Sequence, residues 1–316
     1  MSHDGPHLVI VGSAEDAHVV AICERLPASC TPLILDYSRY LRTFSADLQI
    51  GSGGETNVRV RPSEQESLSE VRRIWWRRPM SFHYPADVDG EMKEFLNIQF
   101  EFFWTSCFSA LPESAIWYND WRMDYAVDRN AYQLKRAAQI GFCVPDTLIT
   151  SSDDSAIAFM KKHKKVALKQ FGGSRSLWMP TTLATKEYIE KMWVARRYPV
   201  ILQEYIEGRF DYRIIVIDDA VTAVEFDTGS SSYAYDVRVD LKTSCREIAI
   251  EPSYSEALIN VVKSFGLRYG AIDLRRRANG ELVFLELNPA GQFLYLDKRA
   301  GTNVAAAMAR ALSLGG

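Results

Sequence analysis

Two acidic side chains near the end of the chain are spaced so that they could hold a divalent cation together. Asp273 and Glu286 lie in two apolar runs that flank Asn279-Gly280, a dipeptide that favours a two-residue hairpin turn. A turn there places Asp273 opposite Glu286, with their Cβ atoms about 4.5–5.5 Å apart. Two carboxylates held this close repel each other and lose hydration, and a shared cation relieves both effects.

An amide oxygen completes the set of candidate ligands. Asn288 lies two residues after Glu286, so it points to the same face of the strand. Mg²⁺ takes one or two carboxylates and completes its shell with waters and phosphate oxygens. The sequence therefore predicts a magnesium site at Asp273, Glu286 and Asn288. The alternative is an exposed hairpin face on which the two acids are simply solvated.

Cationic residues elsewhere suit phosphate or carboxylate groups. Lys169 leaves a short apolar strand just before Gly172 and Gly173, as in a flexible flap whose backbone amides approach phosphates. Taken alone, this pattern is also that of an ordinary surface lysine. The tandem Arg77 and Arg78 could bind carboxylates or phosphates in bidentate fashion, or they could be solvated arginines at a strand end.

The first third of the chain reads as an α/β scaffold for these groups. Residues 7–11 predict a buried parallel strand that leads into a helix within 14–26, and residues 32–35 predict a second strand. Gly12 stands without the other glycines of GxGxxG, so dinucleotide binding is disfavoured. Residues 45–70 suggest a small meander, and residues 90–110 a helix whose aromatic side chains we expect in the core.

The rest of the chain alternates strands and helices. An apolar strand at 199–208, a strand pair at 213–217 and 221–226, and a helix at 253–266 that ends at a glycine precede the acidic hairpin. A terminal helix is expected at 302–314. The segment 228–235 is rich in Gly and Ser and reads as a loop.

Composition narrows the class of protein. The 316 residues are 47% hydrophobic and 24% charged, with a net charge of −3, as in a globular protein with no predicted affinity for nucleic acid or membranes. The five cysteines form no CxxC pair and are expected to be reduced thiols. No signal peptide is evident, and we expect a cytoplasmic protein.

The hairpin and the residues before it resemble a known family. The stretch DLRRRANGELVFLELNPAGQF at 273–293 resembles the metal-binding end of the ATP-grasp fold. Its ending ELNPAGQF, together with the WxRRP segment at 75–79, resembles the graspetide synthetases, which macrocyclise peptides and are also called microviridin-type or omega-ester peptide ligases. The resemblance is good over about residues 117–300 and poor over the first hundred.

The resemblance implies a fold and a division of the chain. We expect an α/β (α+β) protein with the ATP-grasp fold and a Rossmann-like domain before it. The expected parts are an N-terminal αβ domain at 1–116, a central ATP-grasp subdomain at 117–199, and a C-terminal subdomain with the Mg²⁺ site at 200–316.

The resemblance also assigns roles to residues. Arg213 of the Asp-x-Arg segment and Arg238 would stabilise the transition state, and the metal trio would hold two Mg²⁺ ions under the ATP phosphates. Arg77 and Arg78 are candidate substrate-binding residues. Arg129 stands where many relatives have the first ATP lysine, so this phosphate contact departs from the family pattern. The residues implied in ATP binding are Arg129, Lys169, Gly172, Gly173, Gln203, Glu204, Ile206 and Asp211.

The activity that the resemblance implies is ATP-dependent macrocyclisation of a ribosomally made precursor peptide with leader and core segments. An Asp or Glu side chain would be activated as an acyl phosphate and joined to a Thr/Ser hydroxyl or a Lys amine. Two alternatives stay open: a ligase that adds amino acids to a peptide or protein terminus, and a nucleotide-binding protein without catalysis. The resemblance is compatible with a homodimer.

Overall fold

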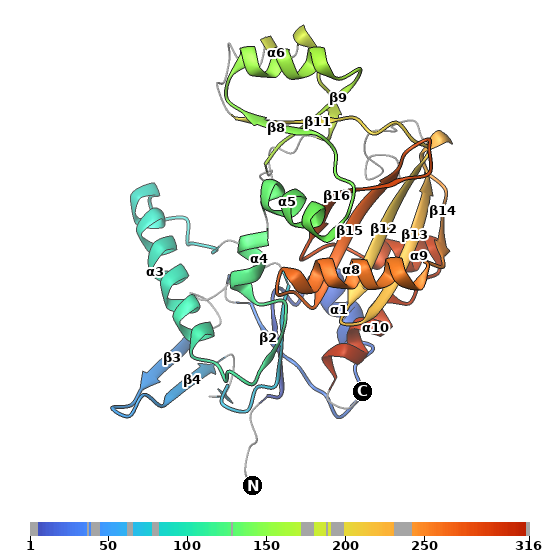
Figure 1. Ribbon diagram of the computed structural model, residues 1–316. Coiled ribbons are helices and arrows are strands. Elements are labelled where there is room, and N and C mark those ends of the chain that lie inside the picture. Colours follow the sequence, from blue (N-terminus) through green and yellow to red (C-terminus); the bar gives the residue numbers. More distant parts are fainter. Residues whose placement is uncertain are drawn as a thin grey trace.

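The chain folds into several sheets with helices packed against them (Figure 1), and the predicted α/β class is confirmed. The computed structural model describes residues 6–36, 38, 45–61, 66–77, 82–127, 129–171, 180–187, 189–190, 199–230 and 242–313.

The first sheet is parallel and has the strand order β2-β1-β6-β7. Its strands are β1 (Leu8–Val11), β2 (Leu33–Leu35), β6 (Arg73–Trp76) and β7 (Ile116–Tyr118). Helix α1 (Ala17–Cys23) follows β1, and the carboxylate of Asp16 caps its first turn. The predicted meander is present as the antiparallel sheet of β3 (Ser45–Ile50), β4 (Thr56–Arg61) and β5 (Glu66–Ser67).

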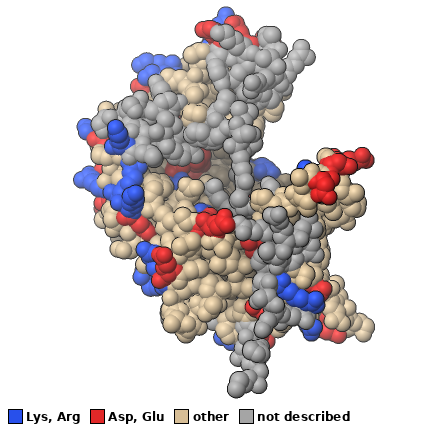
Figure 2. Space-filling model, turned by 180° about the vertical axis from the view of Figure 1, so that it is seen from behind, with Lys and Arg blue, Asp and Glu red and all other residues tan. Residues whose placement is uncertain are grey.

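The expectation that the aromatic side chains of helix α3 (Gly90–Ser109) all lie in the core is wrong. Trp104 and Phe108 are buried, but Phe95 is 55% and Phe102 is 70% exposed. The helix projects from the body of the molecule (Figure 1), and acidic side chains gather at its tip (Figure 2). Only the inner face of α3 is therefore buried, although its outer face also carries large apolar side chains.

A separate lobe contains the second sheet, which has the order β10-β9-β11-β8 and lies beneath helix α6 (Figure 1). Its strands are β8 (Thr147–Thr150), β9 (Val166–Lys169), β10 (Thr182–Leu183) and β11 (Val200–Glu204), and α6 spans Asp153–Lys162. A small core between α6 and the sheet includes Ala156, Leu168 and Leu202. Helices α4 (Trp121–Val127) and α5 (Asn130–Ile140) connect the first sheet to this lobe.

The third part is an antiparallel five-stranded sheet with the order β14-β13-β12-β15-β16. Its strands are β12 (Phe210–Ile217), β13 (Ala220–Asp227), β14 (Cys245–Ile248), β15 (Tyr269–Arg276) and β16 (Leu282–Asn288). A short 3-10 turn, Thr228–Ser230, follows β13. Helix α8 (Pro252–Ser264) covers one face of the sheet (Figure 1). Helices α9 (Leu294–Ala300) and α10 (Val304–Leu312) end the fold.

The acidic hairpin has the predicted carboxylate pairing but a different turn. Asp273 faces Glu286, as expected. The loop, however, has three residues rather than two: Arg277 N–H donates to the Glu281 carbonyl at 2.8 Å, and Gly280 has a φ of +92°. That loop shifts the register by one residue. A β-bulge on β16 shifts it back, because the consecutive residues Asp273 and Leu274 face Glu286 and Phe284 and leave Leu285 as the extra residue. The two deviations cancel before the metal trio.

The two faces of the five-stranded sheet have different neighbours. One face packs against α5 and α8 through a continuous apolar core. The other face packs at one end against α1, α9, α10 and the first sheet, and this shared core joins the N-terminal and C-terminal parts. Among the described residues, no helix has the length and apolar character needed to cross a membrane.

Candidate active site

Two Asp-x-Arg segments lie antiparallel on neighbouring strands of the five-stranded sheet. Asp211 on β12 faces Arg275 on β15, and Arg213 faces Asp273. Arg213 Nη1 donates to Asp273 Oδ1 at 2.7 Å, and Arg275 Nε lies 3.3 Å from Asp211 Oδ1. Because cross-strand partners share a face, these four charged groups form one polar patch. This crossed pairing was not predicted, although the Asp-x-Arg repeat is visible in the sequence.

Arg213 is the charged centre of this patch. Its side chain is only 11% exposed. Burial alone would lower the pKa of Arg213, but the adjacent Asp273 carboxylate outweighs burial and raises that pKa above its usual value. The guanidinium is therefore permanently cationic. Within the described part of the chain its Nε has no hydrogen-bond partner, so the group keeps donor capacity for an anionic ligand.

The predicted metal trio comes together on the same face as Arg213. Asp273 faces Glu286, and Asn288 lies two residues further along β16, opposite Ala271. All three side chains are half-buried. Asn288 Oδ1 also accepts a hydrogen bond from Ala290 N–H at 3.0 Å, which orients the amide. Two carboxylates and an amide beside an anion-binding arginine fit Mg²⁺ that carries phosphate oxygens in its shell.

The loop after Asn288 is held by buried side chains that the sequence analysis did not connect with the site. Asn119 Nδ2 donates to the Pro289 carbonyl at 2.9 Å, and Arg77 Nη1 donates to the Ala290 carbonyl at 2.8 Å. Arg77 is 2% exposed, and the contacts described for it are internal. Its predicted contact with substrate stays a prediction, and Arg78 lies outside the described residues.

Helix α5 is fastened to the strand that carries two of the metal ligands. Gln133 is 4% exposed and bonds both backbone groups of Leu287, donating to its carbonyl at 2.7 Å and accepting from its N–H at 2.8 Å. Leu287 lies between Glu286 and Asn288, so α5 protects the free edge of β16 beside the site. A glutamine on the apolar face of this helix was the only sequence signal.

Arg129 occupies the N-cap position of α5, where its guanidinium lies 4.8 Å from the centre of the Tyr125 ring. It therefore stands at the start of the helix, as the sequence analysis expected. Its proposed role as a phosphate contact stays a prediction.

Two of the residues predicted to bind nucleotide, Lys169 and Glu204, lie at the ends of β9 and β11. Lys169 ends β9 and pairs with Ile201. Glu204 ends β11, and its carboxylate accepts from Arg277 Nη1 at 2.8 Å and Nη2 at 3.2 Å. That arginine lowers the pKa of Glu204, despite partial burial. The Glu204 side chain is thus already paired within the chain.

Three further predicted nucleotide ligands, Gln203, Ile206 and Asp211, lie within the described part of the chain. Gln203 is buried and donates to Thr147 Oγ1 at 3.1 Å, and Ile206 is 2% exposed, so only its backbone could meet an adenine. Asp211 faces Arg275, as described above. The predicted ligands Gly172 and Gly173 lie outside the described residues, and so does Arg238, which was predicted to be catalytic.

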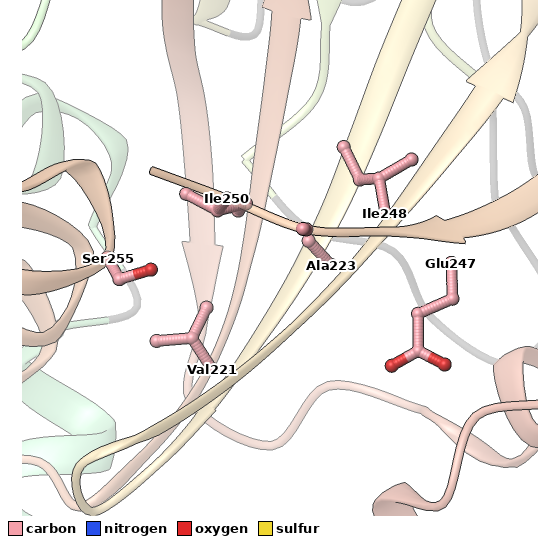
Figure 3. A pocket seen from close by; sticks show the side chains of 7 residues that line it. Val221, Ala223, Glu247, Ile248, Ile250 and Ser255 are labelled. Carbon is pink, nitrogen blue, oxygen red and sulfur yellow. The ribbon is translucent and has the colours of Figure 1, made fainter. Parts of the chain in front are cut away.

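A pocket of about 530 Å³ lies elsewhere, on the face of the sheet that α8 covers (Figure 3). Its lining is mostly aliphatic, with Glu247 and Ser255 as its polar side chains. Val221 and Ala223 belong to the core between the sheet and α8, opposite the charged patch. This pocket is therefore separate from the Arg213–Asp273 site. Its lining residues are Val221, Ala223, Glu247, Ile248, Ala249, Ile250 and Ser255.

Comparisons with known proteins agree on the fold. The RimK-like ATP-grasp domain family matches residues 129–312, more than half of the chain. The macrocyclase MdnC of Microcystis aeruginosa MRC, solved with the precursor peptide MdnA, is similar with a TM-score of 0.85 at 20% identity, covering 98% of this chain and 99% of that one.

Two further solved structures are similar over nearly the whole chain. A RiPP-associated ATP-grasp ligase of Chryseobacterium gregarium, solved with ADP and a leader and core peptide, has a TM-score of 0.82 at 20% identity over 97% of this chain and 95% of that one. The ATP-grasp ligase PsnB, solved with a minimal precursor, Mg and ADP, has a TM-score of 0.78 at 22% identity over 97% and 96%. No curated protein sequence matches this chain.

Proposed function

Because the chain belongs to the RimK-like ATP-grasp family, we propose that it is an ATP-dependent ligase that macrocyclises a ribosomally made precursor peptide. The observation that carries the proposal is that Arg213, Asp273, Glu286 and Asn288 lie together on one face of the sheet. The similarity to the peptide macrocyclases also extends over the first hundred residues, which lie outside the region that matches the RimK-like domain.

In the first step, a carboxylate oxygen of a substrate Asp or Glu attacks the γ-phosphorus of ATP. The bond to the β-phosphate oxygen breaks, which yields an acyl phosphate and ADP. We assign to Arg213, which is held beside Asp273, the role of binding the charge that spreads over the transferred oxygens, and we assign the same role to Arg238. Mg²⁺ held by Asp273, Glu286 and Asn288 would neutralise phosphate charge. Lys169, which ends β9 of the second sheet, would also neutralise phosphate charge.

In the second step, a Thr or Ser hydroxyl, or a Lys amine, attacks the acyl carbon. The carbon–oxygen bond to phosphate breaks, and an ester or amide closes the ring. The proton of the nucleophile leaves with inorganic phosphate. The buried guanidinium of Arg213 would stabilise the negative charge of the departing phosphate, because a guanidinium can bind two phosphate oxygens at once.

We extend the proposal to the organisation of the chain. Residues 1–116, 117–199 and 200–316 form the N-terminal, central and C-terminal parts, with two Mg²⁺ ions and ATP bound between the latter two. The nucleotide contacts are assigned to Arg129, Lys169, the glycines at 172 and 173, and the β11 end at 203–206. The partner is a precursor peptide with leader and core segments.

Intact mass spectrometry tests the proposal directly. The protein is incubated with ATP, Mg²⁺ and candidate precursor peptides rich in Thr/Ser/Lys and acidic residues. Each ring is expected to remove one water, about 18 Da, as the acyl phosphate is consumed. A matched reaction with Asp273→Asn should leave the peptide mass unchanged.

Two other outcomes of this experiment would each favour a different function. The family match to a RimK-like domain favours one second candidate, a ligase that adds amino acids to a peptide terminus. Gains of whole amino-acid residues, in place of losses of water, would establish that activity. Binding of ATP with no ATP consumption across the peptide panel would support a nucleotide-binding protein without catalysis.

A further inference from the structure

The loop at residues 289–293 lies against the carboxyl ends of the first parallel sheet. In open α/β sheets, the crevice outside the carboxyl ends of the strands is the usual place for a ligand. Here Arg77 follows the end of β6, Gly12 follows the end of β1, and a side chain at Gly12 would lie 2.4 Å from the Arg77 carbonyl. The chain itself therefore occupies this crevice, with Arg77 facing the Ala290 carbonyl.

A buried polar network connects α1 and β6 to this loop. Arg77 Nε lies 3.4 Å from Asp16 Oδ2. His18 Nε2 accepts from Phe293 N–H at 3.1 Å, so the ring proton is on Nδ1, which lies 3.2 Å from Asp16 Oδ1 as its donor. Arg77 and His18 are both less than a tenth exposed. Such contacts are costly to leave half-made, so the loop is held in one place.

The loop in turn fixes the positions of two side chains of the active site, Asn288 and Arg213. Ala290 N–H donates to Asn288 Oδ1 at 3.0 Å, and therefore orients the amide assigned to Mg²⁺. The next residue, Gly291, packs so closely that a Cβ there would lie 2.8 Å from Arg213 Nη2. A shift of the Ala290 peptide would thus displace both Asn288 and Arg213.

We infer that Arg77, fixed by Asp16, is a positioning residue that holds the 289–291 loop and through it the magnesium ligand Asn288 and the catalytic Arg213. This inference rests on the proposed function for the identity of the metal site. It replaces the substrate contact predicted for Arg77 with an internal one. The described part of the N-terminal domain that carries Arg77 then supports the metal loop.

The test compares Arg77→Met with Arg61→Met, which removes an exposed arginine that pairs with Asp47 at 2.8 Å. Affinity for Mg²⁺ and ADP is measured by calorimetry in the full chain, and melting temperature by circular dichroism. We expect Arg77→Met to bind Mg²⁺ about 10-fold or more weakly, as when an outer partner of a metal ligand is lost. Arg61→Met should bind as the wild type does.

A second variant separates positioning from the loss of a buried charge. Arg77→Met leaves the Asp16 carboxylate without its cation, whereas Asp16→Asn/Arg77→Met removes both charges. We expect the double variant to recover melting temperature but not Mg²⁺ affinity, because the bond to the Ala290 carbonyl is still missing. Recovery of both would overturn the inference, and so would wild-type Mg²⁺ affinity in Arg77→Met.

Kinetics on a processed peptide add a readout that separates the two roles of Arg77. A positioning role lowers kcat and weakens the dependence on Mg²⁺, with an unchanged KM for the peptide. A rise in that KM alone would instead show direct substrate binding and overturn the inference. If no peptide is processed by the wild type, the proposed function fails, while the Mg²⁺–ADP binding series still decides the role of Arg77.

Discussion

Gly291 is the residue at which a single added carbon should do the most damage to the site. A Cβ at this position would lie 2.3 Å from the Cβ of Ala271 and 2.8 Å from Arg213 Nη2. Carbon atoms in contact are normally about 3.5–4.0 Å apart, so the loop must move by about 1 Å or more in Gly291→Ala. The φ of Gly291 is not in the left-handed region, so the cause is space and not backbone strain.

The expected cost of Gly291→Ala has two parts. Insertion of a methyl group into a packed site costs about 1–3 kcal/mol of folding free energy. Displacement of catalytic groups by about 1 Å costs on the order of 100-fold in rate. We therefore expect a modestly lower melting temperature together with a loss of about 100-fold in kcat for ATP consumption with a processed peptide.

A double variant gives the control for this prediction. Ala271→Gly removes the closer of the two obstructing atoms, so Ala271→Gly/Gly291→Ala should recover part of the lost rate. The assay is steady-state ADP release with saturating ATP, with circular dichroism melts of each variant. Wild-type turnover and melting in Gly291→Ala would refute the packing argument, and so would a double variant as slow as the single one.

Three further predictions address other parts of the chain. Asp273→Asn should lower turnover by at least about 100-fold, since it removes an ionic metal ligand, and excess Mg²⁺ should not restore the rate in an ADP-release assay. Gln133→Ala should lower the free energy of unfolding by about 2–3 kcal/mol in urea titrations, because two buried backbone groups of β16 lose their partner; an unchanged unfolding midpoint would contradict this. Burial by itself would raise the pKa of Asp16, but hydrogen bonding by His18 and the charge of Arg77 lower it to about 2. Asp16 therefore stabilises the fold by about 2 kcal/mol above pH 4, and it loses this contribution as the pH falls toward 2. We expect Asp16→Asn to be less stable than the wild type at pH 7, and the difference in stability to shrink below pH 4. An equal difference at every pH would show that charge is not the cause.

Local patterns were enough to predict most elements. Apolar runs bounded by Gly, Pro and Asp predicted β1, β2, β9 and the pair β12–β13, because strand formation follows from short-range alternation and turn residues. The relation of Asp273 to Glu286 was also predicted, although for an incomplete reason. The turn has three residues and a bulge restores the register, two local choices that no dipeptide signal reports.

Exposure was the main quantity that local patterns could not supply. All aromatic residues of α3 look alike in the sequence, yet Trp104 is 2% and Phe102 is 70% exposed. Which face of α3 is buried depends on how the helix lies against the first sheet, and this is a tertiary contact. Likewise, tandem arginines at 77 and 78 suggested a ligand contact, but the depth of Arg77 in the structure depends on the Ala290 carbonyl, 213 residues away in sequence.

The sequence by itself determined the chemical groups: an Asp and a Glu that face each other, an Asn two residues further on, and an Asp-x-Arg segment. Those features are set by strand alternation and turn chemistry over a few residues. Only the tertiary structure decided which groups meet between β12 and β15, which are far apart in the sequence, and how firmly the groups of the site are held. The crossed pairs of Asp211 with Arg275 and Arg213 with Asp273 require β12 to lie beside β15, and that neighbour relation arises from burial of a shared core over a long sequence separation.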